Sequence, residues 1–157
     1  MIPSFDHWQA APAQCQGGAV ALGNFDGFHL GHQILFSEVV SKAYQNKGAS
    51  VAVTFEPHPL KVVRPDIGLK LISTAEQKKE LIALANIDAL VILPFTKEFA
   101  NTPAEAFVDQ VLRKAIAAHK AIYLPMGYYV ISDTLTLKPD TVLIGLNPLV
   151  TALVLLD

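Results

Sequence analysis

The segment from Val20 to His32 constrains the fold of this chain more than any other stretch of the sequence. It begins as an apolar strand, passes through a turn punctuated by glycines, and reaches His29 and His32 just as a helix begins. Backbone N–H groups at a helix N-terminus attract anions, and histidines placed there can donate to the same oxygens. The segment therefore indicates a phosphate site that follows a buried strand.

Apolar strands and amphipathic helices alternate along most of the chain. The pattern predicts strands at 19–25, 50–55, 88–93 and 121–124, and helices at 31–46, 73–86 and 102–118. Ser73 and Glu76 have the spacing of a capping box, and Thr102 precedes Pro103 as a cap precedes the first helical residue. Such alternation gives parallel strands joined by helical crossovers, in an open α/β sheet with helices on both faces. Ligands of these sheets bind beyond the carboxyl ends of the strands, where the predicted turn lies.

The sequence changes in character near Tyr128. Short β-prone pieces follow one another at 129–131, 134–137, 141–144 and 151–156, without a helical pattern between them. We therefore expect an α/β domain over residues 1–118 and a β-strand-rich segment over 119–157 that is not an independent domain. Exposed edges of apolar strands associate with other strands. We expect the segment to extend the sheet, with a homodimer through the C-terminal strands as the alternative.

The composition argues against several classes of partner. A net charge of -2, from 12 basic and 14 acidic side chains, gives no general attraction to nucleic acid or to an acidic membrane surface. No apolar run approaches the ~20 residues that a membrane helix needs, and the N-terminus lacks the pattern of a signal peptide. The single cysteine, Cys15, is compatible with a reducing cytoplasm. We expect a cytoplasmic protein that binds neither nucleic acid nor membrane and has no metal cluster of its own.

Residues 23–32 contain the His-x-Gly-His signature of the nucleotidylyltransferase superfamily. In its longer form the segment resembles the adenylyltransferase module of bacterial bifunctional riboflavin kinase/FAD synthetase. Further matching runs occur in the family's order at 53–59, 71–74 and 95–107, so that the resemblance covers about residues 15–115. It implies a Rossmann-like open parallel sheet, ATP and FMN as substrates, and transfer of AMP from ATP to FMN. It also implies Mg²⁺, held largely through the nucleotide phosphates.

The resemblance implies a role for each matched position. His29 and His32 are expected to bind the ATP phosphates. The other positions carried over are Gly23, Gly27 and Gly31 for close approach to the nucleotide, Asn24, Phe25 and Asp26 on the nucleotide side, and Phe55, His58 and Pro59 near the flavin. A rigid loop that ends a strand is the alternative for residues 56–59.

Several other charged or titratable residues are expected to be ordinary surface groups. These are Glu76, Lys78, Lys79 and Glu80, on one solvated helix face, and the histidines His7 and His119.

The resemblance stops before two later motifs of the family. The sequence contains neither the Asp-Phe-Arg-Phe-Gly loop nor the Ser-Ser-Thr-x-x-Arg helix start that closes over the triphosphate, and it contains no riboflavin kinase domain. Residues 121–157 instead resemble a piece of a right-handed parallel β-helix of the pectate-lyase-like type, on the runs 124–132 and 134–145. The simplest interpretation is a chimera, joined between about Arg113 and Tyr123. A divergent end of the same enzyme is the alternative.

Two functions therefore remain open. One is FMN adenylyltransferase activity, and the other is a catalytically inactive chimeric or engineered scaffold that retains a vestigial phosphate site.

Overall fold

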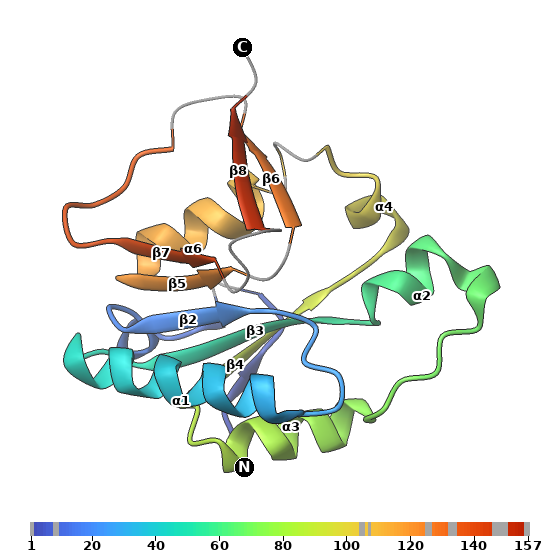
Figure 1. Ribbon diagram of the computed structural model, residues 1–157, viewed down its shortest axis with the longest axis horizontal. Coiled ribbons are helices and arrows are strands. Elements are labelled where there is room, and N and C mark those ends of the chain that lie inside the picture. The colour runs from blue at the N-terminus through green and yellow to red at the C-terminus, as the bar shows by residue number, and fades with distance from the viewer. Residues whose placement is uncertain are drawn as a thin grey trace.

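The fold is that of a computed structural model (Figure 1), which describes residues 2–7, 10–103, 106, 108–124, 127–131, 135–145 and 151–155. The strands of the described chain are β1 (Ser4–Phe5), β2 (Ala19–Leu22), β3 (Ser50–Glu56), β4 (Ala89–Pro94), β5 (Ala121–Leu124), β6 (Gly127–Ile131), β7 (Val142–Gly145) and β8 (Thr151–Leu155). The helices are α1 (Leu30–Gln45), α2 (Pro59–Val63), α3 (Ala75–Leu84), α4 (Lys97–Ala100) and α6 (Arg113–Ala118), with short turns η2 (Ala13–Cys15) and η3 (Pro65–Ile67) and a π-helical turn η4 (Val108–Leu112).

Six parallel strands form one sheet in the order β1-β4-β3-β2-β5-β7. Strand β2 lies between β3 and β5, with Ala19 opposite Ser50 on one side and opposite Ala121 on the other. The chain runs from β2 through β3 to β4 on one side and then returns to place β5 on the other. In open parallel sheets, ligands bind at such a reversal of strand order, beyond the carboxyl ends of the strands. The predicted open α/β sheet is confirmed, and its reversal point is β2.

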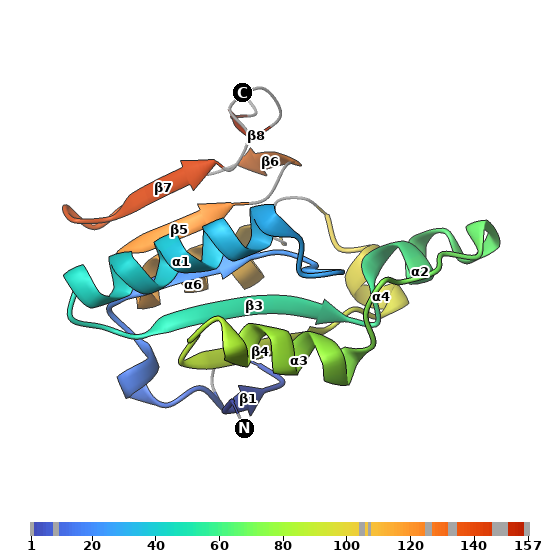
Figure 2. The ribbon, with the colours of Figure 1, turned by 60° about the horizontal axis from the view of Figure 1, so that its bottom comes forward.

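Helices cover both faces of this sheet, as Figure 2 shows with α1 and α3 on the near face and α6 behind. Successive strand residues point to opposite faces. Ala19 and Ala21 pack with Phe36 of α1 and Ile82 of α3 on one face of the sheet. Val20 and Leu22 belong to a second core on the other face. The members of that second core from 108–118 are Val108, Val111, Leu112, Ala115 and Ile116. Every residue of β2 is buried, because both of its faces and both of its edges are covered.

Two helix starts differ from the predicted ones by one residue. Helix α1 begins at Leu30 with His29 as its cap, and α3 has its capping box at Thr74 and Gln77. Ser73 does not cap α3, because its hydroxyl hydrogen-bonds to Asp26 in a distant turn. The short helices α2 and α4 were not predicted. The predicted helix start at 102–105 falls partly on residues 104–105, which lie outside the described residues, but the predicted helical content reappears at 108–118.

The C-terminal strands take two different places. Strand β7 pairs in parallel with β5 and extends the main sheet, whereas β6 and β8 pair in parallel with each other as a separate sheet. Because several residues between these strands lie outside the described part, an all-β segment over 119–157 stays a prediction, as does the domain boundary at residue 118. In the described ranges, no helix has the length and apolar character needed to cross a membrane.

The prediction that His119 is a surface histidine is wrong. Its side chain is buried at the end of α6, with Nε2 3.1 Å from the carbonyl oxygen of Cys15 and Nδ1 3.3 Å from that of Ala115. Burial lowers the pKa of His119. The ring thus joins two segments that are 104 residues apart in sequence.

Candidate phosphate site at the carboxyl end of β2

The first residues of the turn after β2 still hydrogen-bond to the neighbouring strand β3. The Gly23 N–H donates to the Val53 carbonyl at 3.0 Å, and the Thr54 hydroxyl donates to the Asn24 carbonyl at 3.2 Å. Phe25 then adopts a positive φ of 49°, which turns its ring inward, where only 3% of the residue is exposed. That ring packs on Phe36 of α1, with centroids 4.8 Å apart. The turn is therefore fixed on the sheet by backbone bonds and by one buried ring, while Asn24 faces solvent.

The three glycines of the turn make room for the protein's own side chains. A methyl group at Gly23 would lie 2.6 Å from the Phe25 ring, and one at Gly27 would lie 2.8 Å from Ile72. Gly27 also has a φ of +68°, which side-chain-bearing residues rarely adopt. A methyl group at Gly31 would stand 3.2 Å from the His29 ring. Local packing thus favours glycine at 23 and 27, whereas at 31 a small shift of the exposed His29 ring would make room; the predicted closeness of all three to a nucleotide stays a prediction.

The two histidines stack on each other at the start of α1. Their ring centroids are 3.7 Å apart with an interplanar angle of 19°, and Nδ1 of His29 accepts a hydrogen bond from the His32 backbone N–H at 3.3 Å. A neutral ring whose Nδ1 accepts carries its proton on Nε2. His29, which is exposed, therefore offers one N–H donor beside the backbone N–H groups of Leu30 and Gly31, since those of His32 and Gln33 are bonded to His29 itself.

His32 is the more enclosed of the pair. The edge of Phe25 meets its ring, with centroids 5.4 Å apart. Burial, and then the charge that His29 would carry, lower the pKa of His32 to about 4, although Asp26 opposes them. His32 is therefore neutral at pH 7. Its buried Nδ1 has no hydrogen-bond partner among the residues that the structure describes, and is therefore an unsatisfied polar atom directly beneath the His29 ring.

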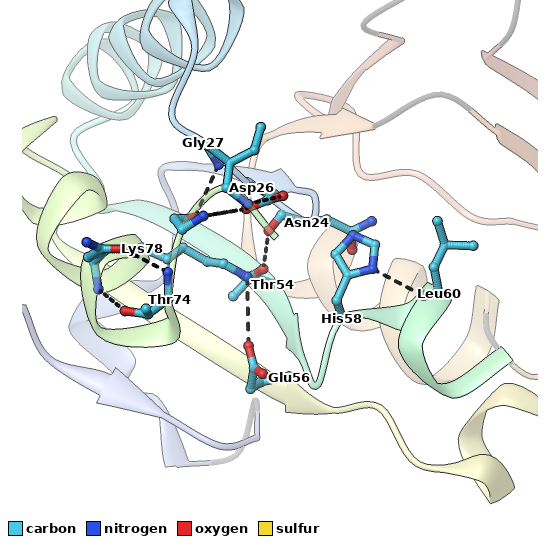
Figure 3. Close-up of polar contacts among 12 residues, drawn as sticks. Asn24, Asp26, Gly27, Thr54, Glu56, His58, Leu60, Thr74 and Lys78 are labelled. Atoms are coloured by element: carbon cyan, nitrogen blue, oxygen red, sulfur yellow. Dashed lines mark hydrogen bonds and ion pairs between the residues drawn. The ribbon is translucent and has the colours of Figure 1, made fainter. Parts of the chain in front are cut away.

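Asp26 clamps the turn to the segment that precedes α3. Its carboxylate accepts hydrogen bonds at 3.0 Å from the backbone N–H groups of Ile72 and Ser73 and from the Ser73 hydroxyl. Gly27 N–H donates to the same hydroxyl at 3.2 Å. Burial raises the pKa of Asp26, but these bonds and nearby His58 outweigh it and hold that pKa below its ordinary value. Figure 3 shows the clamp beside the end of β3. The sequence interpretation missed the contribution of Ser73.

The predicted site residues at the end of β3 lie in two different places, Phe55 in the core and His58 at the start of α2. Phe55 is buried in the core, with its ring 5.6 Å from that of Phe95, so its side chain is not brought together with the histidines. His58 is buried too, and its Nδ1 accepts from the Leu60 N–H at 3.2 Å to cap α2, which begins at Pro59. The position of these residues near a flavin stays a prediction.

The prediction that Lys78 belongs to a solvated helix face is wrong. Lys78 is 4% exposed, and its ammonium lies 3.9 Å from a carboxylate oxygen of Glu56. Burial lowers the pKa of Lys78, whereas Glu56 and Asp26 raise it. Lys78 stands one helical turn before Ile82, the fully buried residue of α3, and this spacing was the sequence signal for its inward position.

The described side chains contain no group of three His, Cys, Asp or Glu residues arranged to hold a metal ion. Asp26, the carboxylate nearest the histidine turn in sequence, is occupied by three protein donors. What the site presents is instead a set of N–H donors: the His29 ring and the first turn of a 16-residue helix, next to an unsatisfied His32 nitrogen. Such donors fit the oxygens of a phosphate.

Comparisons with known proteins agree with this geometry. A family model described as FAD synthetase matches residues 11–126. The bifunctional riboflavin kinase/FMN adenylyltransferase of Buchnera aphidicola subsp. Schizaphis graminum is 35% identical over 94 residues, which are 60% of this chain and 30% of that protein. The FAD synthetase of Listeria monocytogenes is 30% identical over 115 residues, which are 72% of this chain and 46% of that protein. The chain thus spans less than half the length of either relative.

A solved structure also shares the fold. The protein titled "Crystal Structure of Macrolide-efflux Protein from Streptococcus pneumoniae" superposes with a TM-score of 0.64 and 25% identity, over 82% of this chain and 43% of that one. The family model covers strands β2 to β5 and the histidine turn between β2 and α1. The chain therefore belongs to the FAD synthetase family.

Proposed function

We propose that this chain binds ATP at the turn after β2 and transfers its AMP to FMN. The observation that carries the proposal is the stacked pair of His29 and His32 at the N-terminus of α1, on the strand where the sheet reverses its order. Relatives named FMN adenylyltransferase and FAD synthetase support the choice of substrates.

The chemistry asks for alignment and charge stabilisation. An oxygen of the FMN phosphate attacks the α-phosphorus of ATP, a new P–O bond forms, and the bond to the leaving pyrophosphate breaks. No protein nucleophile is needed, so the site contributes by positioning both phosphates and by donating hydrogen bonds to their oxygens. In this proposal the Nε2–H of His29 and the His32 ring bind the ATP phosphates. Mg²⁺ would be held by the phosphates themselves and would neutralise part of their charge.

The second candidate is a scaffold that binds the nucleotide without turnover. It is favoured by the stretch directly after β5, which differs from the Asp-Phe-Arg-Phe-Gly loop that the resemblance implies there. Loss of one preorganised donor commonly costs ~10²–10³ in rate. A site that loses donors in this way would bind ATP yet transfer AMP slowly or not at all.

We also propose that the segment of about 121–157 comes from a different parent, a parallel β-helix, and that the chain is a chimera, although the FAD synthetase match extends to residue 126 and so includes β5. Two parallel pairs support this proposal: β5 with β7 and β6 with β8. In each pair the later strand follows the earlier one after a similar length of chain, as successive coils of a parallel β-helix do. Recovery of the same reading frame in a full-length natural relative would contradict a chimeric origin.

The test is FAD formation from FMN, ATP and Mg²⁺, followed by chromatography with flavin detection. We expect His29→Ala and His32→Ala each to lower the rate ~10²–10³-fold, because each removes a donor to the phosphates. His7→Ala is the matched control, since His7 is exposed and its contact is with neighbouring Asp6. Activity that survives both site substitutions would overturn the assignment of these histidines.

Binding distinguishes the two candidates. ATP titrated into the wild-type chain should release heat that is lost in His29→Ala. Binding without FAD formation would favour the scaffold, and the absence of both would refute the phosphate site.

A further inference from the structure

Lys78 lies inside the molecule, although its neighbours on α3 do not. Lys79 is half-buried and Glu80 is exposed, whereas Lys78 is 4% exposed. An ammonium removed from water is unfavourable unless opposite charges and hydrogen bonds compensate for the lost hydration. An aliphatic residue would fill the same place without that cost. The presence of a lysine there therefore points to a specific task.

The compensating charges come from two different segments at the carboxyl edge of the sheet. Glu56, the last residue of β3, has a carboxylate oxygen 3.9 Å from the Lys78 ammonium, and Asp26 in the turn after β2 also attracts it. Figure 3 shows the Lys78 side chain leaving α3 and running toward the end of β3, where Glu56 lies. The ammonium thus lies closest to Glu56 at the end of β3, and the charge of Asp26 adds to the attraction without a direct contact being part of it.

Each of these carboxylates stands at the base of a loop. Asp26 holds the backbone of Ile72 and Ser73, which fixes the histidine turn against the start of α3. Glu56 is followed directly by the segment 57–59, and its carbonyl accepts a hydrogen bond from Phe95 N–H at 3.1 Å. A shift of the ammonium would therefore be felt on the phosphate side of the site and on the side of His58 together.

We infer that Lys78 is a positioning residue: its ammonium ties α3 to Glu56, while Asp26 ties the histidine turn to the residues directly before α3, so that together they set the distance between that turn and the 56–59 segment. The inference rests on the proposed adenylyl transfer, because that reaction requires two phosphates, one from each substrate, in line. Lys78 itself is too enclosed to contact either substrate. It acts through Glu56.

The kinetic test compares Lys78→Met with Lys79→Met. Methionine keeps the length and apolar stem of lysine and removes the charge, and Lys79 is the adjacent lysine of the same helix. We expect Lys78→Met to lower kcat for FAD formation by roughly tenfold to a hundredfold, as a small misplacement of reacting groups does, with KM for ATP changed less than threefold. Lys79→Met should match the wild type.

A second readout needs no substrate. The groups that face His58 are Lys78 from α3, Asp26 from the turn, Glu56 from β3 and Lys61 from α2. Burial lowers the pKa of His58, and the charge of Lys78 lowers it further. A proton NMR titration of the free chain should show the pKa of His58 raised in Lys78→Met and unchanged in Lys79→Met. A wild-type chain that makes no FAD would contradict the proposed function, whereas an unchanged His58 titration in Lys78→Met would show that the lysine does not act on this segment and would overturn the inference by itself.

A purely structural lysine gives a different result. In that case Lys78→Met lowers the urea midpoint and raises the pKa of His58 through the loss of its charge, but leaves kcat as in the wild type, and the inference is overturned. Lys78→Gln, which keeps a polar end at similar length, serves if the methionine variant does not fold. The same two readouts then apply, with the same expected directions.

Discussion

Strands β2 and β7 belong to the same sheet and have the same length and apolar character, yet their surroundings differ. Both have four uncharged residues, Ala-Val-Ala-Leu in β2 and Val-Leu-Ile-Gly in β7. All of β2 is buried between two strands and two helical layers, whereas Val142 in β7 is 52% exposed and, among the strands that the structure describes, β7 pairs with β5 alone. Position in the sheet, and not local composition, decides which strand can support a site. The turn after β2 is held from several directions at once.

The largest expected difference between the centre and the edge is in stability. Ile122 of β5 is fully buried, so Ile122→Ala should lower the free energy of unfolding by about 2–5 kcal/mol through lost burial and an internal cavity. Val142→Ala at the edge should change it by less than about 0.5 kcal/mol. Urea denaturation followed by circular dichroism measures both. If both substitutions lowered the free energy of unfolding equally, β7 would be as enclosed as β5, and the contrast between centre and edge would be wrong.

The clamp at the central strand comes next. Asp26→Ala removes a carboxylate that accepts three hydrogen bonds from Ile72 and Ser73. We expect a loss of about 1–3 kcal/mol in the free energy of unfolding, together with weaker ATP binding, because the N–H and hydroxyl donors of buried Ser73 are left unsatisfied. Asp66→Ala is the control, since Asp66 is exposed and pairs with Arg64 two residues away. Unchanged proteolysis of the 57–72 segment in Asp26→Ala would show that the clamp does not hold it.

The pH dependence sharpens the comparison further. The pKa of His32 is about 4 in the folded chain, against an ordinary 6.5, so the unfolded chain takes up a proton at His32 that the folded chain refuses. The stability that neutral His32 contributes is therefore complete above pH 6.5 and is lost as the pH falls toward 4. His58 and His119, with lowered pKa values, act in the same direction. His32→Gln should remove part of this acid sensitivity, and urea midpoints between pH 7 and 4 would reveal it.

The smallest expected effect on stability is at the outer edge. A homodimer through the C-terminal strands remains our proposal for a partner, because β7 offers an uncharged strand with no described neighbour beyond it. Val142→Lys should change the free energy of unfolding by less than about 0.5 kcal/mol and should shift the chain toward monomer. Light scattering at increasing concentration measures the association. A wild-type chain that is monomeric throughout would refute this proposal.

The sequence predicted the parts of the molecule that depend on local pattern. The strands 50–55 and 88–93, the helix after His29 and the position of the turn beyond β2 follow from apolar periodicity and from glycine and cap signals. The contacts of Ser73 and Lys78 could not be predicted in the same way. They depend on Asp26 and Glu56, residues remote in sequence whose proximity exists only once the strands have paired. The short helix α2 was missed because its five residues are too few to show a helical period of apolar positions.

The clamp at Asp26 has a consequence for the length of the chain that it encloses. Residues 57–72 leave the sheet at the end of β3 and project away from it with α2 (Figure 1). The segment ends at Ser73, which is bonded to Asp26 in the turn after β2. Because both ends are fixed, the cost of a longer excursion is only the entropy of closing a larger loop, about 0.6 kcal/mol for each doubling. Insertions near Gly68, which is exposed and has open space around it, should leave the histidine turn undisturbed. This segment is therefore the part of the molecule where length can vary while the phosphate site stays the same.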